Sequence, residues 1–458
     1  MEAAFFYQWP HMSLISISFL YLFLPLSVAF YYLLPYRFRP AALLAISCVF
    51  LALAQPWCLP PIIAGIVTDL IIIRLMARFD TNDKLRCRLM QLSVVKNLLV
   101  IFLTGALFET GRTPLFLGMT ICLISSLDAV ISFYRREQQY EPGTGIIPFA
   151  LHCMFFPRLY AGPVQPYREF AMQLTQIHFN LRNLFIGVGQ LAQGGLKITL
   201  FGYQFLALRQ RLIETTLATP SLLSLWGSSL LFAFALYYTL SGFSDMAQGV
   251  GAIYGIFLPQ NFYYPYQSRS VTDFFERFNM TGTAFLRRNV YWPLKGGEAA
   301  KPNVISDFLY LLLCGMLVGL WFGLKSSYML WGVFMMSFIA LERHVYPRIL
   351  RFLPTLFCRV GTFLLALAGF SLMSAKNPVA GLKALADMLG LGGLPLYDNG
   401  TLYIFSTNGA LLLIGLFFCT NLINIILLWL RKNIPLMADL LLCAVNVILF
   451  AILTAVLL

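Results

Sequence analysis

Charged side chains are scarce in this chain: they make up 11% of its 458 residues, whereas 59% of the residues are hydrophobic. Because a soluble domain carries roughly 25% charged residues, this composition excludes an ordinary soluble fold. Histidine is rare as well, with four residues, and the nine cysteines form neither a CxxC pair nor a cluster with histidine. The sequence therefore indicates no metal site and no disulfide framework, and the cysteines are interpreted as small core hydrophobes.

Apolar runs make up most of the chain. Runs of about 20 apolar residues recur from end to end, and each is long enough to cross a bilayer as a helix. We expect an all-α polytopic membrane protein with about 11–13 membrane segments, because lipid leaves no partner for unpaired backbone amides and short alternating strands are absent. No internal repeat is visible, which argues against the inverted repeats of secondary transporters. We predict one membrane domain, with N-terminal spans at 1–145, a core at 146–343 and C-terminal spans at 344–458.

The formal charge of +13 comes from basic residues that we place in short loops between spans. Such charges set membrane orientation, so they argue against nucleic-acid binding. If Arg37 and Arg39, a charged loop over 74–96, and Arg135 with Arg136 all face the cytoplasm, the spans alternate and the N-terminus lies outside. Basic loops also favour contact with anionic membrane lipids. The N-terminus lacks the basic region of a signal peptide, so the first span is expected to stay attached.

Residues 146–164 differ from the other apolar runs. This stretch contains Pro157, Gly162 and Pro163, and Arg158 lies in its middle. An intact spanning helix tolerates such a composition poorly, so we expect a broken or re-entrant segment that is buried in protein or lines a cavity. Arg158 is therefore a candidate substrate-binding residue.

Polar residues gather in one long stretch, 241–295, followed by a shorter one at 319–332. Spans are expected near 222–240 and 244–257, on either side of the first small residues. Asp245 lies among serines and glycines that let other helices approach closely. It is either a hydrogen-bonded structural acid or a residue with a role in chemistry.

Ser270 is expected to cap a helix, because Asp273 stands three residues further on, as in a capping box. Phenylalanines then alternate with charged residues as far as Arg288. This pattern suits a helix near the cytoplasmic face that is partly sunk into the protein. An ordinary amphipathic helix on the membrane surface would show the same pattern.

Several motifs occur in a fixed order along the chain. They are FFPRLYAGPVQPYREF, SGFSDMAQGVGAIYGIFLPQNFYYPYQSRSVTDFFERF, LRRNVYWPLKGG, and GLWFG followed by LWG and ALER. Over residues 10–430 the chain resembles the membrane-bound O-acyltransferases, in the bacterial branch that contains alginate O-acetylase. The resemblance implies a helical bundle around a central funnel. It also implies an acyl-CoA or acyl-carrier thioester as the cytoplasmic donor, an acceptor on the other side, and a further envelope or membrane protein that completes the transfer.

The histidines that the resemblance implies are missing here. Trp321-Phe322-Gly323 stands in the place of Trp-His-Gly, so Phe322 replaces the family's catalytic histidine. Asn279 and Met335 stand at two further family histidine positions, and Arg287-Arg288-Asn289 replaces an Arg-Asp-Tyr triplet. Phenylalanine has no exchangeable proton and asparagine does not titrate, so we expect general acid–base catalysis to be lost there. The expected funnel or substrate-binding residues are Asn279, Arg277, Trp321, Phe322, Asp245, Arg158 and Tyr291.

Other titratable groups offer weak replacements for the missing base. His152 precedes Arg158 by six residues and could reach a central cavity, so it is the remaining candidate among the histidines. Asp245 and Glu276 are alternative bases, although neither has a partner at a telling spacing. The other histidines, His11, His178 and His344, are interpreted as loop or interfacial positions.

Three hypotheses about function follow. The favoured one is a component of envelope polysaccharide O-acylation, biosynthesis or secretion that is catalytically degenerate and binds a partner. The second is an active O-acyltransferase that moves an acyl group, such as acetyl, from a cytoplasmic thioester to an extracytoplasmic polysaccharide with a non-standard base. The third is a non-enzymatic conduit or scaffold. In each case we expect a multi-pass protein of the bacterial cytoplasmic (inner) membrane without a bound cofactor.

Overall fold

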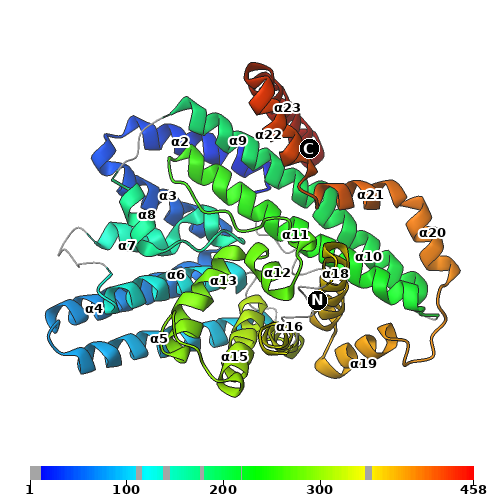
Figure 1. The fold of residues 1–458 in the computed structure, drawn as a ribbon. Coiled ribbons are helices and arrows are strands. Elements are labelled where there is room, and N and C mark those ends of the chain that lie inside the picture. Colours follow the sequence, from blue (N-terminus) through cyan, green and yellow to red (C-terminus); the bar gives the residue numbers. More distant parts are fainter. Residues whose placement is uncertain (1–11, 110–115, 138–144, 176–179, 218, 346–352) are drawn as a thin grey trace. The chain divides into compact units, whose positions relative to one another are not determined.

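The fold is almost entirely helical (Figure 1). The computed structural model describes residues 12–458 except 110–115, 138–144, 176–179, 218 and 346–352. Within these residues the one strand-like pairing is an isolated antiparallel bridge between Phe262 and Phe278. The expectation of an all-α protein is confirmed.

Eight of the described helices are long and apolar enough to cross a membrane, or up to nine if one bent pair counts as a single span. The bent pair, Asn399–Thr407 with Gly409–Phe418, has an angle of 65° at its break. Three shorter apolar helices, Phe19–Leu33, Gly118–Tyr134 and Ile146–Leu159, fall below the length of a full span. The larger number expected from sequence counted such short runs as membrane segments. The chain is a multi-pass membrane protein.

Two compact units make up the chain. Unit 1 comprises Met1–Gly195, Phe243–Gln260 and Phe450–Leu458, and unit 2 comprises Leu196–Gly242 and Asn261–Leu449. Two helices are divided between the units, α11 (Leu222–Ile253) and α23 (Pro435–Leu457), and Leu196, the last residue of α9 (Leu181–Leu196), is the first of unit 2.

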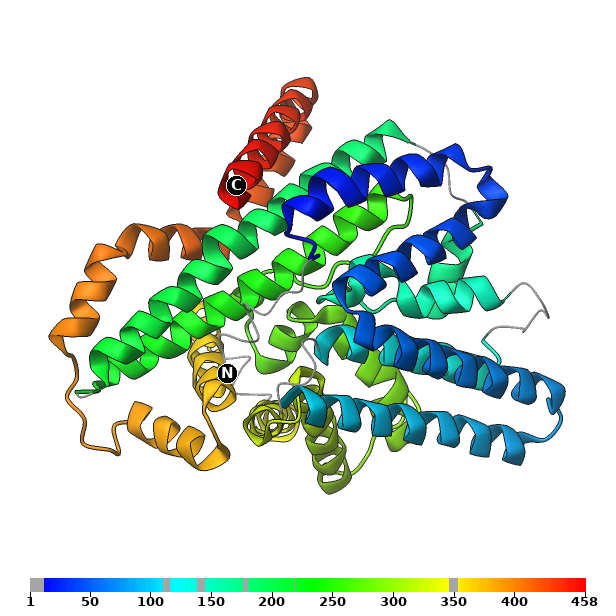
Figure 2. The ribbon, with the colours of Figure 1, turned by 180° about the vertical axis from the view of Figure 1, so that it is seen from behind.

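The helices of unit 1 up to α9 are drawn in blue to green in Figures 1 and 2. In chain order they are η1 (Phe19–Phe23), α2 (Leu24–Leu33), η2 (Tyr36–Phe38), α3 (Arg39–Ala54), η3 (Pro56–Cys58), α4 (Leu59–Arg78), α5 (Asp83–Glu109), α6 (Phe116–Tyr134), α7 (Ile146–Met154), η4 (Phe156–Leu159), α8 (Tyr167–Gln173) and α9 (Leu181–Leu196). Helices α4, α5 and α6 pack against one another, and α7 packs against α3, α4, α6 and α8.

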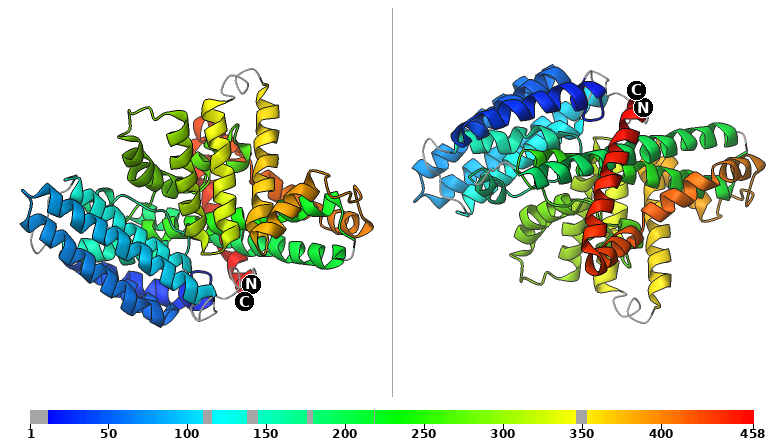
Figure 3. Two further views of the ribbon diagram at one scale, coloured as in Figure 1. Left: turned by 90° about the horizontal axis from the view of Figure 1, so that it is seen from below. Right: turned by 90° about the horizontal axis from the view of Figure 1, so that it is seen from above.

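Unit 2 contains the remaining helices. They are η5 (Lys197–Gly202), α10 (Tyr203–Thr216), η6 (Pro265–Gln267), α12 (Val271–Arg277), α13 (Met280–Leu286), η7 (Arg287–Tyr291), α14 (Trp292–Lys295), α15 (Val304–Phe322), α16 (Ser326–His344), α18 (Thr355–Ser374), α19 (Pro378–Met388), α20 (Asn399–Thr407), α21 (Gly409–Phe418) and α22 (Leu422–Asn433). Helix α16 packs against α15, α18 and α12, and α15, α16 and α18 are drawn in yellow-green to gold in Figure 3.

Glycines allow α15 and α16 to form a tight antiparallel hairpin. A Cβ atom built on Gly315 would lie 2.5 Å from the Gly332 carbonyl oxygen, and one on Gly319 would lie 2.5 Å from Met329 Cα. Small residues at such contacts let two backbones approach closely in a membrane protein. The hairpin therefore places the start of α15 beside the end of α16.

Two sequence expectations about spans are wrong. Residues 241–244 do not separate two spans, because α11 continues as one helix through Ser241 and Gly242. The charged loop expected over 74–96 is short, because α4 ends at Arg78 and α5 begins at Asp83. Lys96 thus lies well inside α5. Charged side chains do not interrupt the backbone hydrogen bonds of a helix, so they do not mark its end.

The broken character of residues 146–164 is confirmed. Helix α7 ends at Met154, the short turn η4 follows, and the chain then runs without regular structure to α8. The helix break falls just before Pro157, which lacks a backbone donor and disfavours helical conformation in the residue before it. Residues Phe155–Leu159 are nonetheless buried.

Candidate functional site

The motif residues of unit 2 form a small pocket between α12, α13, α15 and α16. The cavity has a volume of about 10 Å³, which is at the lower limit of what a single water molecule needs. Its lining consists of Phe275, Phe278, Asn279, Gly282, Thr283, Leu286, Val318, Trp321, Phe322 and Trp331. We call it the motif pocket, and three of the expected site residues, Asn279, Trp321 and Phe322, lie in it.

Phe322 is a packing residue in this pocket. Its side chain is 4% exposed, and its ring meets the Trp331 ring edge-on, with centroids 5.6 Å apart and an interplanar angle of 87°. Trp331 is fully buried and stacks on Phe370 of α18 at 6.1 Å and 16°. Edge-to-face and offset-stacked pairs of this kind are favourable aromatic geometries. Phe322 is therefore part of an aromatic core.

Asn279 joins α12 to α13 in the left-handed backbone conformation, with φ of 53°. Asparagine tolerates this conformation better than most residues. The Asn279 side chain lies against Gly282, where a Cβ atom would come within 2.6 Å of its Nδ2. Asn261 holds the turn in place: its carbonyl accepts from Met280 N at 2.9 Å, and its Oδ1 accepts from Thr281 N at 3.1 Å.

Met335 lies one helical turn beyond Trp331 on α16 and is fully buried. A Cβ atom built on Gly369 would lie 2.8 Å from Met335 Sδ and 3.3 Å from Trp331 Cδ1. The structure thus gathers Phe322, Asn279 and Met335 around the Trp331 ring. Phe322 and Met335 belong to consecutive helices, and Asn279 belongs to the turn between α12 and α13. Their assignment to family histidine positions stays a prediction.

The motif pocket has little capacity for proton transfer. None of its ten lining residues carries a group that titrates between pH 2 and 10, because the polar members are an amide, a hydroxyl and two indoles. Phenylalanine at 322 offers no lone pair to a substrate proton. The pocket can exclude water and make hydrogen bonds through Asn279 and Thr283.

Arg277 and Tyr291 lie outside the pocket lining. Arg277 ends α12, donates from Nε to Asp273 Oδ1 at 2.6 Å, and stands over the Tyr263 ring. The expected cap is present, since Ser270 Oγ accepts from Asp273 N at 3.0 Å. Arg277 is therefore held at the surface of its own helix.

The remaining expected site residues belong to unit 1. His152 is fully buried between the Tyr167 and Phe170 rings, each 5.3 Å from its own ring centre. Arg158 is also buried, donates to the His152 carbonyl oxygen, and lies over Phe170 with its guanidinium carbon 5.2 Å from the ring centre. Asp245 is half-buried on α11. The lining of the motif pocket lies wholly in unit 2, so a funnel that joins these residues to it stays a prediction.

Sequence reasoning missed a second polar cluster in unit 2, formed by Asp307, His344, Tyr291 and Arg343. We call it the Asp307 cluster. The Tyr291 hydroxyl donates to Asp307 Oδ1 at 2.5 Å, and His344 Nε2 lies 2.7 Å from Asp307 Oδ2. Arg343 Nη1 donates to the Tyr291 oxygen at 2.5 Å and lies 3.5 Å from Asp307 Oδ1. The Asp307 side chain is 3% exposed, whereas that of His344 is 25% exposed.

The Asp307 cluster shifts the pKa of Tyr291. Burial and the hydrogen bond to Asp307 raise the pKa of the Tyr291 hydroxyl from 10.0 to about 12, against an opposing effect of the Arg343 guanidinium. The cluster lies at the start of α15, about 22 Å along the helix from Phe322, given 1.5 Å per residue. His344 is the last residue of α16, and its acidic partner stands 37 residues earlier in the chain. The sequence offered one signal for this pair: Asp307 lies in the first turn of one helix and His344 at the end of the next, so an antiparallel hairpin brings them together.

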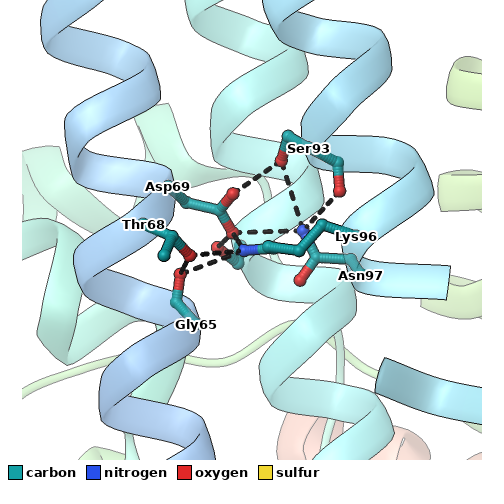
Figure 4. Close-up of polar contacts among 7 residues, drawn as sticks. Gly65, Thr68, Asp69, Ser93, Lys96 and Asn97 are labelled. Carbon is teal, nitrogen blue, oxygen red and sulfur yellow. Dashed lines mark hydrogen bonds and ion pairs between the residues drawn. The ribbon is translucent and has the colours of Figure 1, made fainter. Parts of the chain in front are cut away.

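Unit 1 contains a further buried acid that sequence reasoning missed (Figure 4). Asp69 of α4 is fully buried and accepts hydrogen bonds from Ser93 Oγ at 2.7 Å, Ser126 Oγ at 2.6 Å and Asn97 Nδ2 at 3.1 Å. These partners come from α5 and α6. The carboxylate thus ties three membrane helices together.

Lys96 completes this network from the outer side of α5. Its Nζ lies 2.7 Å from Asp69 Oδ2 and donates to Gly65 O at 3.1 Å and to Thr68 Oγ1 at 3.0 Å (Figure 4). All three ammonium protons therefore have acceptors, as a charged group at membrane depth requires.

Comparison with known proteins places the chain. A model of the MBOAT, membrane-bound O-acyltransferase family, matches residues 48–379. The chain is 28% identical over 420 residues to the probable alginate O-acetylase AlgI of Azotobacter vinelandii, covering 87% of this chain and 82% of the relative. It is 26% identical over 319 residues to the peptidoglycan O-acetyltransferase of Helicobacter pylori, covering 63% and 59%. With the teichoic acid D-alanyltransferase of Bacillus subtilis it shares 28% over 194 residues, covering 40% and 47%. The chain belongs to the membrane-bound O-acyltransferase family.

Proposed function

We propose that this chain is a membrane component of envelope polysaccharide O-acylation, that its motif pocket is catalytically degenerate, and that it serves as a partner-binding subunit. Family membership and the relatives' activities on alginate, peptidoglycan and teichoic acid support the substrate class. The acyl donor would be an acyl-CoA or acyl-carrier thioester. The acceptor would be an extracytoplasmic polysaccharide reached from a bacterial cytoplasmic membrane, with the N-terminus outside.

One observation carries the proposal: Phe322, which the resemblance assigns to the family's histidine position, is packed into the Trp331 core. General acid–base catalysis contributes about 10²–10⁴-fold to rate. A chain without a titratable group in this pocket loses that factor for any reaction there. Hydrogen bonding by Asn279 and shape complementarity can persist without it, so binding can outlast catalysis.

The partner follows from the same reasoning. In the resembled branch, a second envelope protein completes transfer to the polymer. A subunit that keeps the family scaffold but not its base has a use when another protein supplies the missing chemistry. We therefore expect a stable complex with a second membrane or envelope protein.

Transfer and complex formation can be tested together. The full chain, purified in detergent, is given labelled acetyl-CoA or acyl-carrier protein and an acceptor glycan. The proposal expects no acylation of the glycan by the chain alone and a second envelope protein that co-purifies from native membranes. Robust acylation by the chain alone that disappears in His152→Ala or Asn279→Ala would overturn it.

A further inference from the structure

Unit 2 retains an oriented acid–base pair away from the motif pocket. We propose that His344, oriented by Asp307, is a catalytic acid–base residue for acyl transfer from a thioester to a small hydroxyl acceptor. The two substrate classes, a thioester donor and a hydroxyl acceptor, rest on the proposed function. The position of the site at His344 rests on the structure alone. Degeneracy would then be confined to the motif pocket.

Orientation of the imidazole is the first argument. The Asp307 side chain is 3% exposed and is held by the Tyr291 hydroxyl through Oδ1, which leaves Oδ2 directed at His344 Nε2 at 2.7 Å. An ionised carboxylate only accepts hydrogen bonds, so the neutral imidazole carries its proton on Nε2. The hydrogen bond at one ring nitrogen thus sets the other, Nδ1, as the basic atom.

Access is the second argument. The His344 side chain is 25% exposed and the Arg343 side chain 37% exposed, whereas the motif pocket has room for about one water molecule. A substrate can therefore approach the imidazole without rearrangement of the aromatic core.

Local charge is the third argument. Arg343 shares the Tyr291 hydroxyl and lies 3.5 Å from the buried carboxylate. Lys295 stands on the Tyr291 ring with its Nζ 5.4 Å from the centroid. Arg343 thus offsets the Asp307 carboxylate and Lys295 adds a second positive charge beside Tyr291, which favours an oxyanion that develops on a reacting carbonyl.

The proposed step balances without a redox partner. His344 Nδ1 takes the proton of the acceptor hydroxyl while the hydroxyl oxygen forms a bond to the thioester carbonyl carbon. The carbon–sulfur bond then breaks, the sulfur leaves with the electron pair, and the imidazolium returns the proton to it. The products are an ester and a free thiol.

A purely structural role is the competing explanation, since the cluster also ties the start of α15 to the end of α16. Chemical rescue separates the two explanations. Free imidazole can replace a missing base in a variant that is folded, whereas a purely structural role would lower the thermal unfolding midpoint of His344→Ala and leave the rate of the folded fraction unchanged.

The experiment follows release of free thiol from acetyl-CoA by the full chain in detergent, with glycerol as the hydroxyl acceptor and with the protein-free rate at each imidazole concentration subtracted. We expect His344→Ala to lower the rate by about 10²-fold and added imidazole to restore part of it. Asp307→Asn, which removes the orienting charge, should lower kcat and leave KM unchanged. Lys301→Gln, an exposed cation outside the cluster, is the matched control and should retain the wild-type rate.

The proposal fails if folded His344→Ala keeps the wild-type rate, or if imidazole accelerates wild type and variant equally. Folding is checked by gel-filtration elution and the thermal unfolding midpoint. Should His344→Ala not fold, His344→Gln keeps a hydrogen-bond donor toward Asp307 and must still lose the rate. Partner co-purification and glycan acylation are measured separately. Failure of the His344 proposal therefore leaves the proposed function standing, and failure of the proposed function leaves the His344 proposal standing.

Discussion

Phe322→Ala should open the motif pocket and destabilise the protein without touching any other motif residue. Phe322 is 4% exposed and contacts the fully buried Trp331 ring. The present cavity of about 10 Å³ shows that the ring fills this space almost completely. Its removal leaves an apolar void that the neighbouring rings, fixed by their own stacking, cannot close.

The size of the effect follows from packing. Removal of the phenyl ring deletes roughly 100 Å³ of side chain, and about 24 cal/mol per Å³ of cavity gives about 2 kcal/mol. Loss of the edge-to-face contact adds about 0.5–1.5 kcal/mol. In a soluble protein, the lost transfer of the side chain from water into the core would add a further cost. That cost is smaller here, because unfolded spans remain in an apolar solvent. We therefore expect a loss of about 3 kcal/mol in free energy of unfolding.

Unfolding in detergent, followed by tryptophan fluorescence, measures this loss. Phe357→Ala is the matched control: its side chain is 68% exposed on α18, so a change within about 0.5 kcal/mol is expected. Benzene, which binds dry engineered cavities, should restore about 2.7 kcal/mol to Phe322→Ala at 100 times its Kd. If Phe322→Ala costs no more than the control and benzene has no effect, the ring is not packed as described.

Three further perturbations test other parts of the structure. Asp69→Ala leaves the Lys96 ammonium without its carboxylate and should lower the free energy of unfolding by about 3 kcal/mol. The double variant Asp69→Ala with Lys96→Met should lose less. Equal losses in the two variants would argue against the ion pair. Because the Tyr291 pKa is raised from 10.0 to about 12, its stabilising contribution is complete below pH 10 and is lost as pH rises toward 12. Absorbance titration of tyrosinate should show this raised pKa falling in Asp307→Asn, and an unchanged pKa would contradict the hydrogen bond. Gly315→Ala places a Cβ atom 2.5 Å from the Gly332 carbonyl and should lower the thermal midpoint, unlike an alanine at Gly361, which meets open space.

Local chemistry was predictable where the signal lies within a few residues. The Ser270 cap and the break before Pro157 both follow from the sequence and are present in the structure. The sequence also shows that Phe322 and Asn279 carry no titratable side chain, and their place at family histidine positions stays a prediction from motif order. The structure adds that both residues line one pocket around Trp331.

Long-range pairing was not predictable from the sequence alone. Asp307 and His344 meet only because the glycines of α15 and α16 bring the two helices into a close antiparallel hairpin. Lys96 was placed in a loop because charged residues commonly mark loops in membrane proteins. Its three oxygen partners, which make the position tolerable inside a helix, come from α4. Composition cannot reveal such a partner when it lies in another helix.

Acylation of an acceptor glycan by the purified chain alone tests the central claim most directly. Labelled acetyl-CoA is the donor, and wild type is compared with Asn279→Ala. The account predicts label on the glycan at background level for both proteins, because the motif pocket holds no base. Wild-type transfer that falls by about 10²-fold or more in Asn279→Ala would contradict it.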